Sequence, residues 1–411
     1  MLRRRLLVFG FFMAVITYLD RVCISAAAPA MARDLDLSRT QMGYVFAVFA
    51  LAYAIFEIPA GWWGDRIGQR RVLTRIVACW SLFTILTGLV RSYWALLAAR
   101  FIFGAAEAGA FPNLSRALNR WFPRTERARA NGIMWMGARL GGSAAPMLAA
   151  WLITLVGWRL SFVIFGLTGI IWCLAFWPWF RDDPAEHPKM SAGELAEIRR
   201  DSPSPAPRAA HPWRRIFSSA NLWALFWMYF CSAFGFYFFV SWLPTFLTEE
   251  HGLTLLRTGV YSTLPLGFGA AGCLAGGVLS DWLVKRTGNV RWARRSIGIA
   301  AFALAAAGFA LASMARDPLA AVLCLAFAQG AHDLALPVAW ATVVEVGGRL
   351  GGATAGFMNM ASSFSAMLSA TAAPWLAATF GTFHAMLAAA AVTYFIGALL
   401  WLRIDPAERV L

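Results

Sequence analysis

The chain has 411 residues, of which 60% are hydrophobic and only 14% are charged. A soluble protein carries roughly 25% charged residues, so the composition excludes an ordinary soluble globular protein. The net charge of +15 does not indicate nucleic-acid binding, because the arginines gather in short loops between apolar runs, as they do in membrane proteins.

Apolar runs of about 20 residues recur along the whole chain. Each is long enough to cross about 30 Å of hydrocarbon as a helix. Continuous apolar runs also exclude a transmembrane barrel, whose strands alternate polar and apolar residues. We therefore expect an all-α polytopic membrane protein with twelve transmembrane helices. The expected spans are 6–31, 41–63, 72–91, 94–117, 130–156, 159–180, 219–248, 258–280, 294–313, 317–346, 350–379 and 383–403.

The loops between these spans differ in charge. Those on one side hold clusters of basic residues, whereas the opposite loops hold single arginines such as Arg33 and Arg159. Basic loops stay in the cytoplasm, so we expect both termini to be cytoplasmic, in a cytoplasmic (inner) membrane of bacterial type. The clusters are Arg3–Arg5, Arg66/Arg70/Arg71/Arg75, Arg116/Arg120/Arg124/Arg127/Arg129 and Lys285/Arg286/Arg291/Arg294/Arg295.

One long polar stretch, 181–218, interrupts the spans. It is rich in Pro, Ser and charge, which is typical of a linker, with at most one short amphipathic helix near 192–200. It divides the chain into a six-helix bundle over 1–180 and a second one over 219–411. We expect a monomer in the lipid bilayer.

The two predicted bundles repeat a short pattern. Gly61 precedes Asp65 by four residues after the second span, with Arg66 and Arg70 following. Gly277 precedes Asp281 in the same way after the eighth span. Parallel repeats of this kind are typical of one class of secondary transporter, in which the substrate binds near the midplane between the halves.

Charged side chains also lie inside the predicted spans. Asp20 and Arg21 occupy the middle of the first span, where each costs about 2.5 to 3.5 kcal/mol to insert. Such a pair indicates a functional site facing protein or water, although a structural ion pair between two helices is the alternative. Arg100, Gly104 and Glu107 share one helical face in the fourth span, and Gly104 leaves room for a neighbouring helix.

These features resemble the major facilitator superfamily over essentially the whole chain. The loop Gly61–Arg71 is similar to the signature loop of that superfamily, so the resemblance implies two pseudo-symmetric six-helix bundles, with Gly61, Asp65, Arg66, Arg70 and Asp281 in conformational gating. A narrower resemblance is to its anion:cation symporters, which include galactonate, glucarate and hexuronate carriers and vesicular sialate and glutamate carriers. The residues that carry it are Asp20-Arg21, Tyr53, Arg100/Phe101/Gly104/Glu107, Trp242/Pro244/Thr245 and Gly356/Asn359.

The resemblance implies proton-coupled uptake of an organic anion, usually a sugar acid such as an aldonate, aldarate or hexuronate. It assigns Asp20 and Glu107 as proton carriers, Arg100 as the partner of Glu107, and Arg21 as the anchor of the substrate carboxylate. A four-charge structural network is the alternative. Protons are the coupling ion, and no cofactor, metal site or enzymatic activity is expected, since no HExxH or paired-Cys spacing occurs.

Further polar residues could line the site. Tyr53, Tyr237, Asn359 and Ser363 could bind the hydroxyls of a sugar acid, and Trp340 could stack on a sugar face, although membrane helices also use Ser and Trp for packing. Arg139 adds a guanidinium in the fifth span; it either receives a second carboxylate or pairs with Glu107.

Two questions therefore remain open: the substrate and its coupling, and the role of a second buried pair. Arg139 favours a dicarboxylate or aromatic-acid transporter, or an anion exchanger without proton coupling. His332 and Asp333 lie in the tenth span and are candidates for a second titrating pair. The alternative is that His332 is a core histidine whose hydrogen bonds are satisfied. Glu57 has a supporting or gating role in this interpretation.

Overall fold

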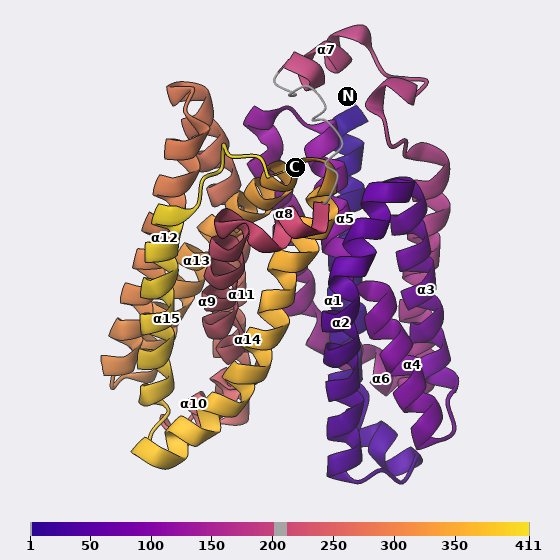
Figure 1. Cartoon of the computed structure of the whole chain (residues 1–411). Helices are drawn as coiled ribbons and strands as arrows, with labels where there is room; N and C mark the ends of the chain where they lie inside the picture. The colour runs from indigo at the N-terminus through magenta and orange to yellow at the C-terminus, as the bar shows by residue number, and fades with distance from the viewer. Residues whose placement is uncertain (1, 201–211, 411) are drawn as a thin grey trace. The chain divides into compact units, whose positions relative to one another are not determined.

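The computed structural model describes residues 2–200 and 212–410, and every regular element in those ranges is helical (Figure 1). The N-terminal elements are α1 (Leu2–Asp34), α2 (Arg39–Ile67), α3 (Gln69–Leu89), α4 (Tyr93–Glu107), α5 (Ala110–Trp121), α6 (Arg127–Trp179) and α7 (Ala192–Arg200). The later ones are α8 (Pro212–Ser218), α9 (Ala220–Ser241), α10 (Leu243–Glu249), α11 (Leu255–Thr287), α12 (Val290–Met314), α13 (Pro318–Gly347), α14 (Gly351–Phe380) and α15 (His384–Arg403).

Ten helical segments of the described residues are long and apolar enough to cross a membrane. Two of them, Arg124–Trp179 with 56 residues and Pro318–Ser369 with 52, are long enough for two crossings each, since one crossing takes about 20 residues. The first bends at Gly157, whose φ of 77° lies in a region that glycine readily adopts. The second is interrupted at Gly348–Leu350. The segments therefore give the twelve predicted crossings.

The predicted fourth span is a broken helix. It is divided into α4 and α5 at Ala108 and Gly109, and Gly is a common point of breakage. Glu107 is consequently the last residue of α4 rather than an interior one. The seventh span is likewise divided at Trp242, ahead of Pro244 in α10.

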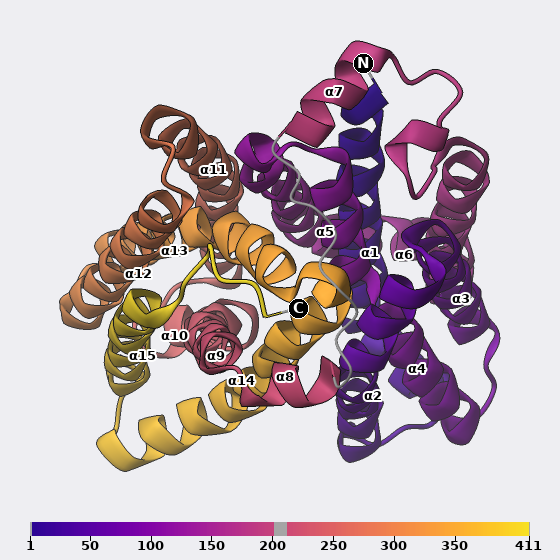
Figure 2. The same cartoon turned by 45° about the horizontal axis from the view of Figure 1, so that its top comes forward.

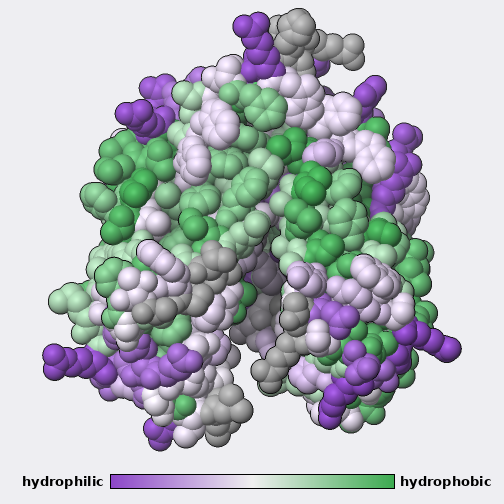
Figure 3. All heavy atoms as spheres, turned by 60° about the horizontal axis from the view of Figure 1, so that its bottom comes forward, coloured by the Kyte–Doolittle hydropathy of each residue, from purple (hydrophilic) through white to green (hydrophobic). Residues whose placement is uncertain are grey.

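The described helices belong to two compact units. Unit 1 comprises Met1–Pro123, Gly137–Pro203 and Leu350–Gly356, and unit 2 comprises Arg124–Met136, Ser204–Arg349 and Phe357–Leu411. Within unit 2, Figure 2 shows α9 with α12, α13, α14 and α15 around it. Apolar side chains cover the flanks of the helices, while hydrophilic ones gather toward their ends (Figure 3), as expected for helices that cross a bilayer.

Glycines let the helices approach closely. A Cβ on Gly104 of α4 would lie 2.5 Å from the Phe49 carbonyl oxygen of α2, and Cβ atoms on Gly272 and Gly276 of α11 would overlap the backbone of α13. Small residues at such crossings are how membrane helices pack without a hydrophobic driving force. The predicted packing role of Gly104 is confirmed.

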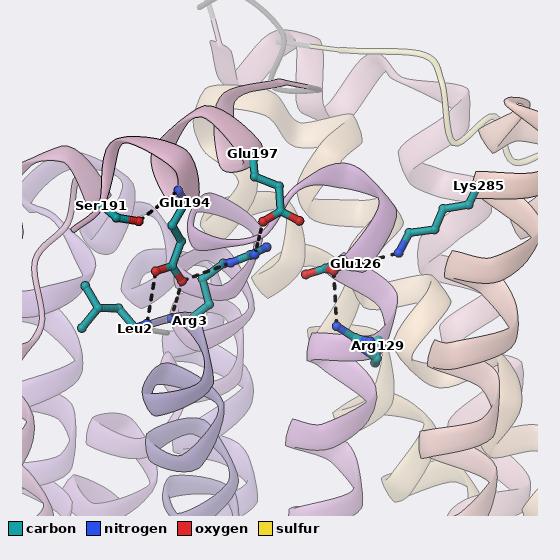
Figure 4. Close-up of polar contacts among 8 residues, drawn as sticks. All are labelled: Leu2, Arg3, Glu126, Arg129, Ser191, Glu194, Glu197 and Lys285. Carbon is teal, nitrogen blue, oxygen red and sulfur yellow. Dashed lines mark hydrogen bonds and ion pairs between the residues drawn. The ribbon is translucent and has the colours of Figure 1, made fainter. Parts of the chain in front are cut away.

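The linker helix α7 contacts the start of α1 within unit 1 (Figure 4). The Glu194 carboxylate accepts hydrogen bonds from the backbone N–H groups of Leu2 and Arg3 at 3.4 and 3.2 Å, and Arg3 also pairs with Glu197. Burial raises the pKa of Glu194, but these N–H groups and the Arg3 guanidinium outweigh it, so that this pKa lies below its usual value. A short helix at 192–200 agrees with the prediction, but the expectation of at most one helix in this linker was wrong, because α8 (Pro212–Ser218) also lies within it.

Candidate functional site

Asp20 and Arg21 lie on α1, in the interior of unit 1. Asp20 is 1% exposed, and neither of its carboxylate oxygens has a hydrogen-bond partner among the described residues. Arg21 Nε lies 2.5 Å from Oε1 of Glu107, whose side chain is 1% exposed. This ion pair joins α1 to the end of α4.

Aromatic rings surround the guanidiniums of this cluster. Arg21 Cζ lies 4.4 Å from the centre of the Tyr53 ring and 5.5 Å from that of Phe49. Arg100, which is 2% exposed, has its Cζ 4.4 Å from the Phe103 ring and 5.1 Å from Phe49. Ring faces attract cations, more strongly where water is excluded. Phe49, which lies against both arginines, was not identified from the sequence.

The resemblance assigns Arg100 as the partner of Glu107, but the structure pairs Glu107 with Arg21. Seven residues separate Arg100 from Glu107 on α4, which places them about 10 Å apart along the helix axis. The charge of Arg100 acts on Asp20 and Glu107, yet no ion pair of Arg100 occurs among the described residues. The pairing depends on which helix passes α4 at the level of Glu107, and that helix is α1.

Arg139 lies on the part of α6 that packs against α1. It is 3% exposed, and the glycines on either side of it approach α1 closely. A Cβ on Gly137 would meet the Phe11 carbonyl oxygen at 2.7 Å, and one on Gly141 would meet the Val15 Cα at 2.9 Å. Arg139 is two residues from each of these glycines, so its buried side chain leaves the opposite face of α6.

The signature loop caps another helix. The Asp65 carboxylate accepts hydrogen bonds from the backbone N–H groups of Gly352 and Ala353, at 3.0 and 2.9 Å, in the first turn of α14. Arg116 lies 3.4 Å from the same carboxylate. A Cβ on Gly61 would overlap the Gly352 carbonyl group, so glycine is required at this close approach.

Two arginines of the loop have other contacts. Arg66 stacks over Trp62, with its Cζ 5.4 Å from the ring. Arg70 donates from its backbone N–H to Asp182 at 2.9 Å and from its guanidinium to the Trp177 carbonyl oxygen at 2.7 Å. Arg70 thereby fixes the loop to the end of α6.

Asp281 repeats the capping contact in unit 2. It accepts hydrogen bonds from the backbone N–H groups of Ala128 and Arg129, at 3.2 and 2.7 Å, in the first turn of α6. A carboxylate at a helix N-terminus satisfies N–H groups and complements the helix dipole. The weak sequence repeat thus corresponds to two equivalent capping contacts.

Glu345, at the end of α13, was not identified from the sequence. Its carboxylate oxygens lie 2.9, 3.3 and 2.7 Å from Arg124, Arg127 and Arg294. The Arg294 side chain is fully buried. In the sequence these arginines indicate only the topology; the single acidic residue that ends a long apolar span was the clue to their partner.

The other predicted binding residues lie in unit 2. Asn359 is buried, and Tyr237 and Ser363 are half-buried. Trp340 is fully buried; its indole N–H donates to the Tyr229 hydroxyl at 3.0 Å, and its ring lies 5.3 Å from that of Trp135. In this state Trp340 packs inside unit 2.

His332 and Asp333, both on α13, form a buried polar cluster with Ser232 of α9 and Gln329 of α13. His332 Nε2 lies 2.5 Å from the Ser232 hydroxyl, and its Nδ1 lies 3.0 Å from the Asp333 carboxylate. Gln329 donates to Asp333 at 2.8 Å. The rings of Phe302 and Tyr394 enclose the imidazole. Among the described residues, no group of three or more His, Cys, Asp or Glu side chains could hold a metal ion.

The long apolar helices and buried charges define a polytopic membrane protein with a charged interior site. A model of the Major Facilitator Superfamily matches residues 10–370, and the chain belongs to that superfamily. It is therefore a transporter and not an enzyme, as the sequence predicts.

Curated relatives match most of the chain. The "Probable sulfoacetate transporter SauU" of Cupriavidus necator is 34% identical over 396 residues, which cover 96% of this chain and 92% of that protein. The "Probable galactarate/D-glucarate transporter GarP" of Escherichia coli K12 is 32% identical, covering 88% and 86%. The "D-galactonate transporter" of Escherichia coli O6:H1 is 30% identical, covering 99% and 97%. The predicted resemblance to sugar-acid carriers is confirmed.

Solved structures share the fold. The proton:xylose symporter XylE, bound to 6-bromo-6-deoxy-D-glucose, superposes with a TM-score of 0.77 at 14% identity, covering 98% of this chain and 95% of that one. The human organic anion transporter MFSD10 has a TM-score of 0.76 at 16% identity, covering 97% and 99%. These similarities confirm the predicted twelve-helix major facilitator fold.

Proposed function

We propose that this transporter takes up an organic carboxylate together with protons, by alternating access. The observation that carries the proposal is the Arg21–Glu107 ion pair beside the buried Asp20. A guanidinium that is already held by an internal carboxylate can exchange it for the carboxylate of a substrate. The planar fork of Arg suits this exchange, because it can bind a substrate carboxylate through two parallel hydrogen bonds.

Anion binding is coupled to protons through the displaced Glu107. When a substrate carboxylate occupies Arg21, Glu107 loses its partner in a site where an unpaired charge is costly. A proton on Glu107 removes that cost. Asp20 is buried beside Glu107, with the Trp80 indole as a nearby donor and, among the described residues, no hydrogen bond within 3.5 Å of either carboxylate oxygen, and it carries a proton for the same reason. Arg100 stays as a fixed positive charge near both carboxyl groups.

Two pairs of contacts act in gating. Asp65 caps α14 and Asp281 caps α6, while Gly61, Arg66 and Arg70 hold the loop that presents Asp65. Breaking and re-forming these caps accompanies the switch between the two access states. His332 and Asp333 are a second proton-binding pair in unit 2.

The substrate is a sugar acid of the aldonate, aldarate or hexuronate class. Tyr53, Tyr237, Asn359 and Ser363 offer hydroxyl and amide partners for its hydroxyl groups, and Trp340 offers a ring face in a state that exposes it. Relatives named for galactarate, glucarate and galactonate support this class.

A small dianion is the second candidate. Arg139 is another buried guanidinium, on the segment of α6 that packs against α1, and one relative is named for sulfoacetate. Transport of such a dianion, or of an aldarate with its two carboxylates, requires Arg139, whereas an aldonate or hexuronate has only one carboxylate for Arg21.

Transport into proteoliposomes tests the proposal. An acid-outside pH gradient should drive accumulation of galactonate, galactarate, glucuronate or sulfoacetate, and Asp20→Asn should abolish accumulation while substrate exchange persists. Asp34→Asn, which alters an exposed ion pair with Arg159, is the matched control. Undiminished accumulation by Asp20→Asn would overturn the coupling role. Accumulation of sulfoacetate that Arg139→Gln abolishes would favour the dianion.

The protein acts as a monomer in the cytoplasmic membrane with both termini in the cytoplasm. A green fluorescent protein fused to the C-terminus should then fluoresce, since it does not mature when exported unfolded. Light scattering of the detergent-purified protein tests the monomer.

A further inference from the structure

A pocket of about 770 Å³ lies in unit 2, where α8, the first turns of α9, the end of α15 and the C-terminal tail meet. Arg215, Arg403 and Arg409 line it, with Glu408 as the acidic residue among the lining side chains. All of the lining residues belong to unit 2, whereas Asp20, Arg21 and Glu107 of the charged site belong to unit 1.

The pocket arginines differ from their neighbours in pairing. Arg291 pairs with Asp405, and Arg294 pairs with Glu345. By contrast, no ion pair of Arg215, Arg403 or Arg409 occurs among the described residues, and all three are exposed. The lining side chains hold three guanidiniums and one carboxylate, which gives the pocket an excess of positive charge; the Glu345 carboxylate, which also acts on Arg409, is already paired with three other arginines.

The start of α9 adds to this positive field. Ala220 and Asn221, the first residues of that 22-residue helix, line the pocket. The N-terminus of a helix carries a partial positive charge and N–H groups without intrahelical partners; here the Ser219 hydroxyl accepts one of them, the N–H of Leu222. Together with the guanidiniums it makes a site suited to a phosphate group.

The wall beside the arginines is aromatic and exposed. Trp223 and Trp227 are one turn apart on α9 and line the pocket, with 37% and 48% of their surface exposed. Phe217 of α8 is 49% exposed, and its carbonyl oxygen accepts the indole N–H of Trp223. Exposed aromatic rings at the end of a membrane helix lie at the level of the lipid headgroups.

The geometry points to a binding site for the phosphate group of an anionic phospholipid. The phosphate lies between the guanidiniums of Arg215, Arg403 and Arg409 and the first turn of α9, while the acyl chains run along Trp223 and Trp227. A free phosphate would bind the same arginines but would make no contact with the aromatic wall. We therefore assign the lipid. Basic pockets next to membrane helices bind anionic headgroups in this manner.

Lipid-dependent stabilisation tests the site on the full chain. Adding phosphatidylglycerol to the detergent-purified protein should raise its melting temperature more than adding phosphatidylcholine. The triple variant Arg215→Gln/Arg403→Gln/Arg409→Gln should lose that difference and bind phosphatidylglycerol about tenfold more weakly or worse in native mass spectrometry. The control Arg4→Gln/Arg71→Gln/Arg214→Gln removes the same charge from exposed arginines outside the pocket and should retain the difference.

Three results would overturn the assignment. The first is an equal response to both lipids. The second is the same loss in the control variant, which would indicate a general charge effect. The third is stabilisation by inorganic phosphate or glycerol 3-phosphate to the same extent as by the lipid, which would make the ligand a soluble phosphate. If the triple variant folds poorly, Arg409→Gln in the C-terminal tail provides the same comparison.

Discussion

Arg21 Nε donates to Glu107 Oε1 across 2.5 Å, and this single contact joins the charged segment of α1 to the break between α4 and α5. The family resemblance had instead predicted that Glu107 pairs with Arg100 of the same helix. The two residues of the pair are therefore expected to be strongly coupled in stability.

Arg21→Gln should destabilise the protein by about 3 to 5 kcal/mol, because it leaves the Glu107 carboxylate buried without its partner. The double variant Arg21→Gln/Glu107→Gln should recover much of that loss, since it removes both charges. Thermal unfolding of the four proteins of this cycle measures the coupling. Additive effects of the two substitutions would show that the pair is not coupled.

The capping contacts of Asp65 and Asp281 should contribute equally to the free energy of unfolding. Each carboxylate accepts two backbone N–H groups in the first turn of a helix, so Asp65→Ala and Asp281→Ala should each cost about 0.5 to 2 kcal/mol. Asp34→Ala, which breaks an exposed ion pair, should cost at most about 1 kcal/mol. Melting temperatures compare them. A neutral Asp281→Ala would contradict the equivalence of the two repeats.

His251, in the loop after α10, should make stability depend on pH. Burial lowers the pKa of His251, and His384 nearby lowers it further, against the opposing charges of Glu250 and Asp317. The unfolded chain therefore binds this proton more readily, so stability present above about pH 6.5 is lost as the pH falls through that value.

His251→Gln should reduce the loss of melting temperature between pH 7.5 and 5.5. Burial and Arg181 likewise lower the pKa of His187, so the double variant His187→Gln/His251→Gln should flatten the profile further. A single variant that follows the parent profile throughout would show that His251 does not contribute.

Gly104 should tolerate no side chain. A Cβ there would lie 2.5 Å from the Phe49 carbonyl oxygen, and we expect Gly104→Ala to cost about 1 to 3 kcal/mol through displacement of α2 from α4. Gly43 of α2 has no atom within 4 Å of such a Cβ. Gly43→Ala should instead stabilise by up to about 1 kcal/mol, as alanine favours helix. Equal melting temperatures for the two variants would contradict this packing.

Local features of the sequence predicted the helices well. Apolar runs of fixed length gave the twelve crossings, and the polar stretch from 181 contained the short helix α7. The glycine-flanked Asp65 and Asp281 were recognised as equivalent because each lies at the same distance from its glycine. The breaks after Glu107 and at Trp242 were missed, since an apolar run continues across both.

The sequence by itself determined which residues share a helix and which face of it they occupy, because the 3.6-residue period is a local property of the backbone. The sequence therefore determined the fold class and the position of the charged residues within the first and fourth spans. Only the tertiary structure decided which partner each charge has: Arg21 for Glu107, the first turn of α14 for Asp65, and three arginines for Glu345. These contacts join helices far apart in the chain, and their level of crossing depends on how glycines and side chains pack, which no local period encodes.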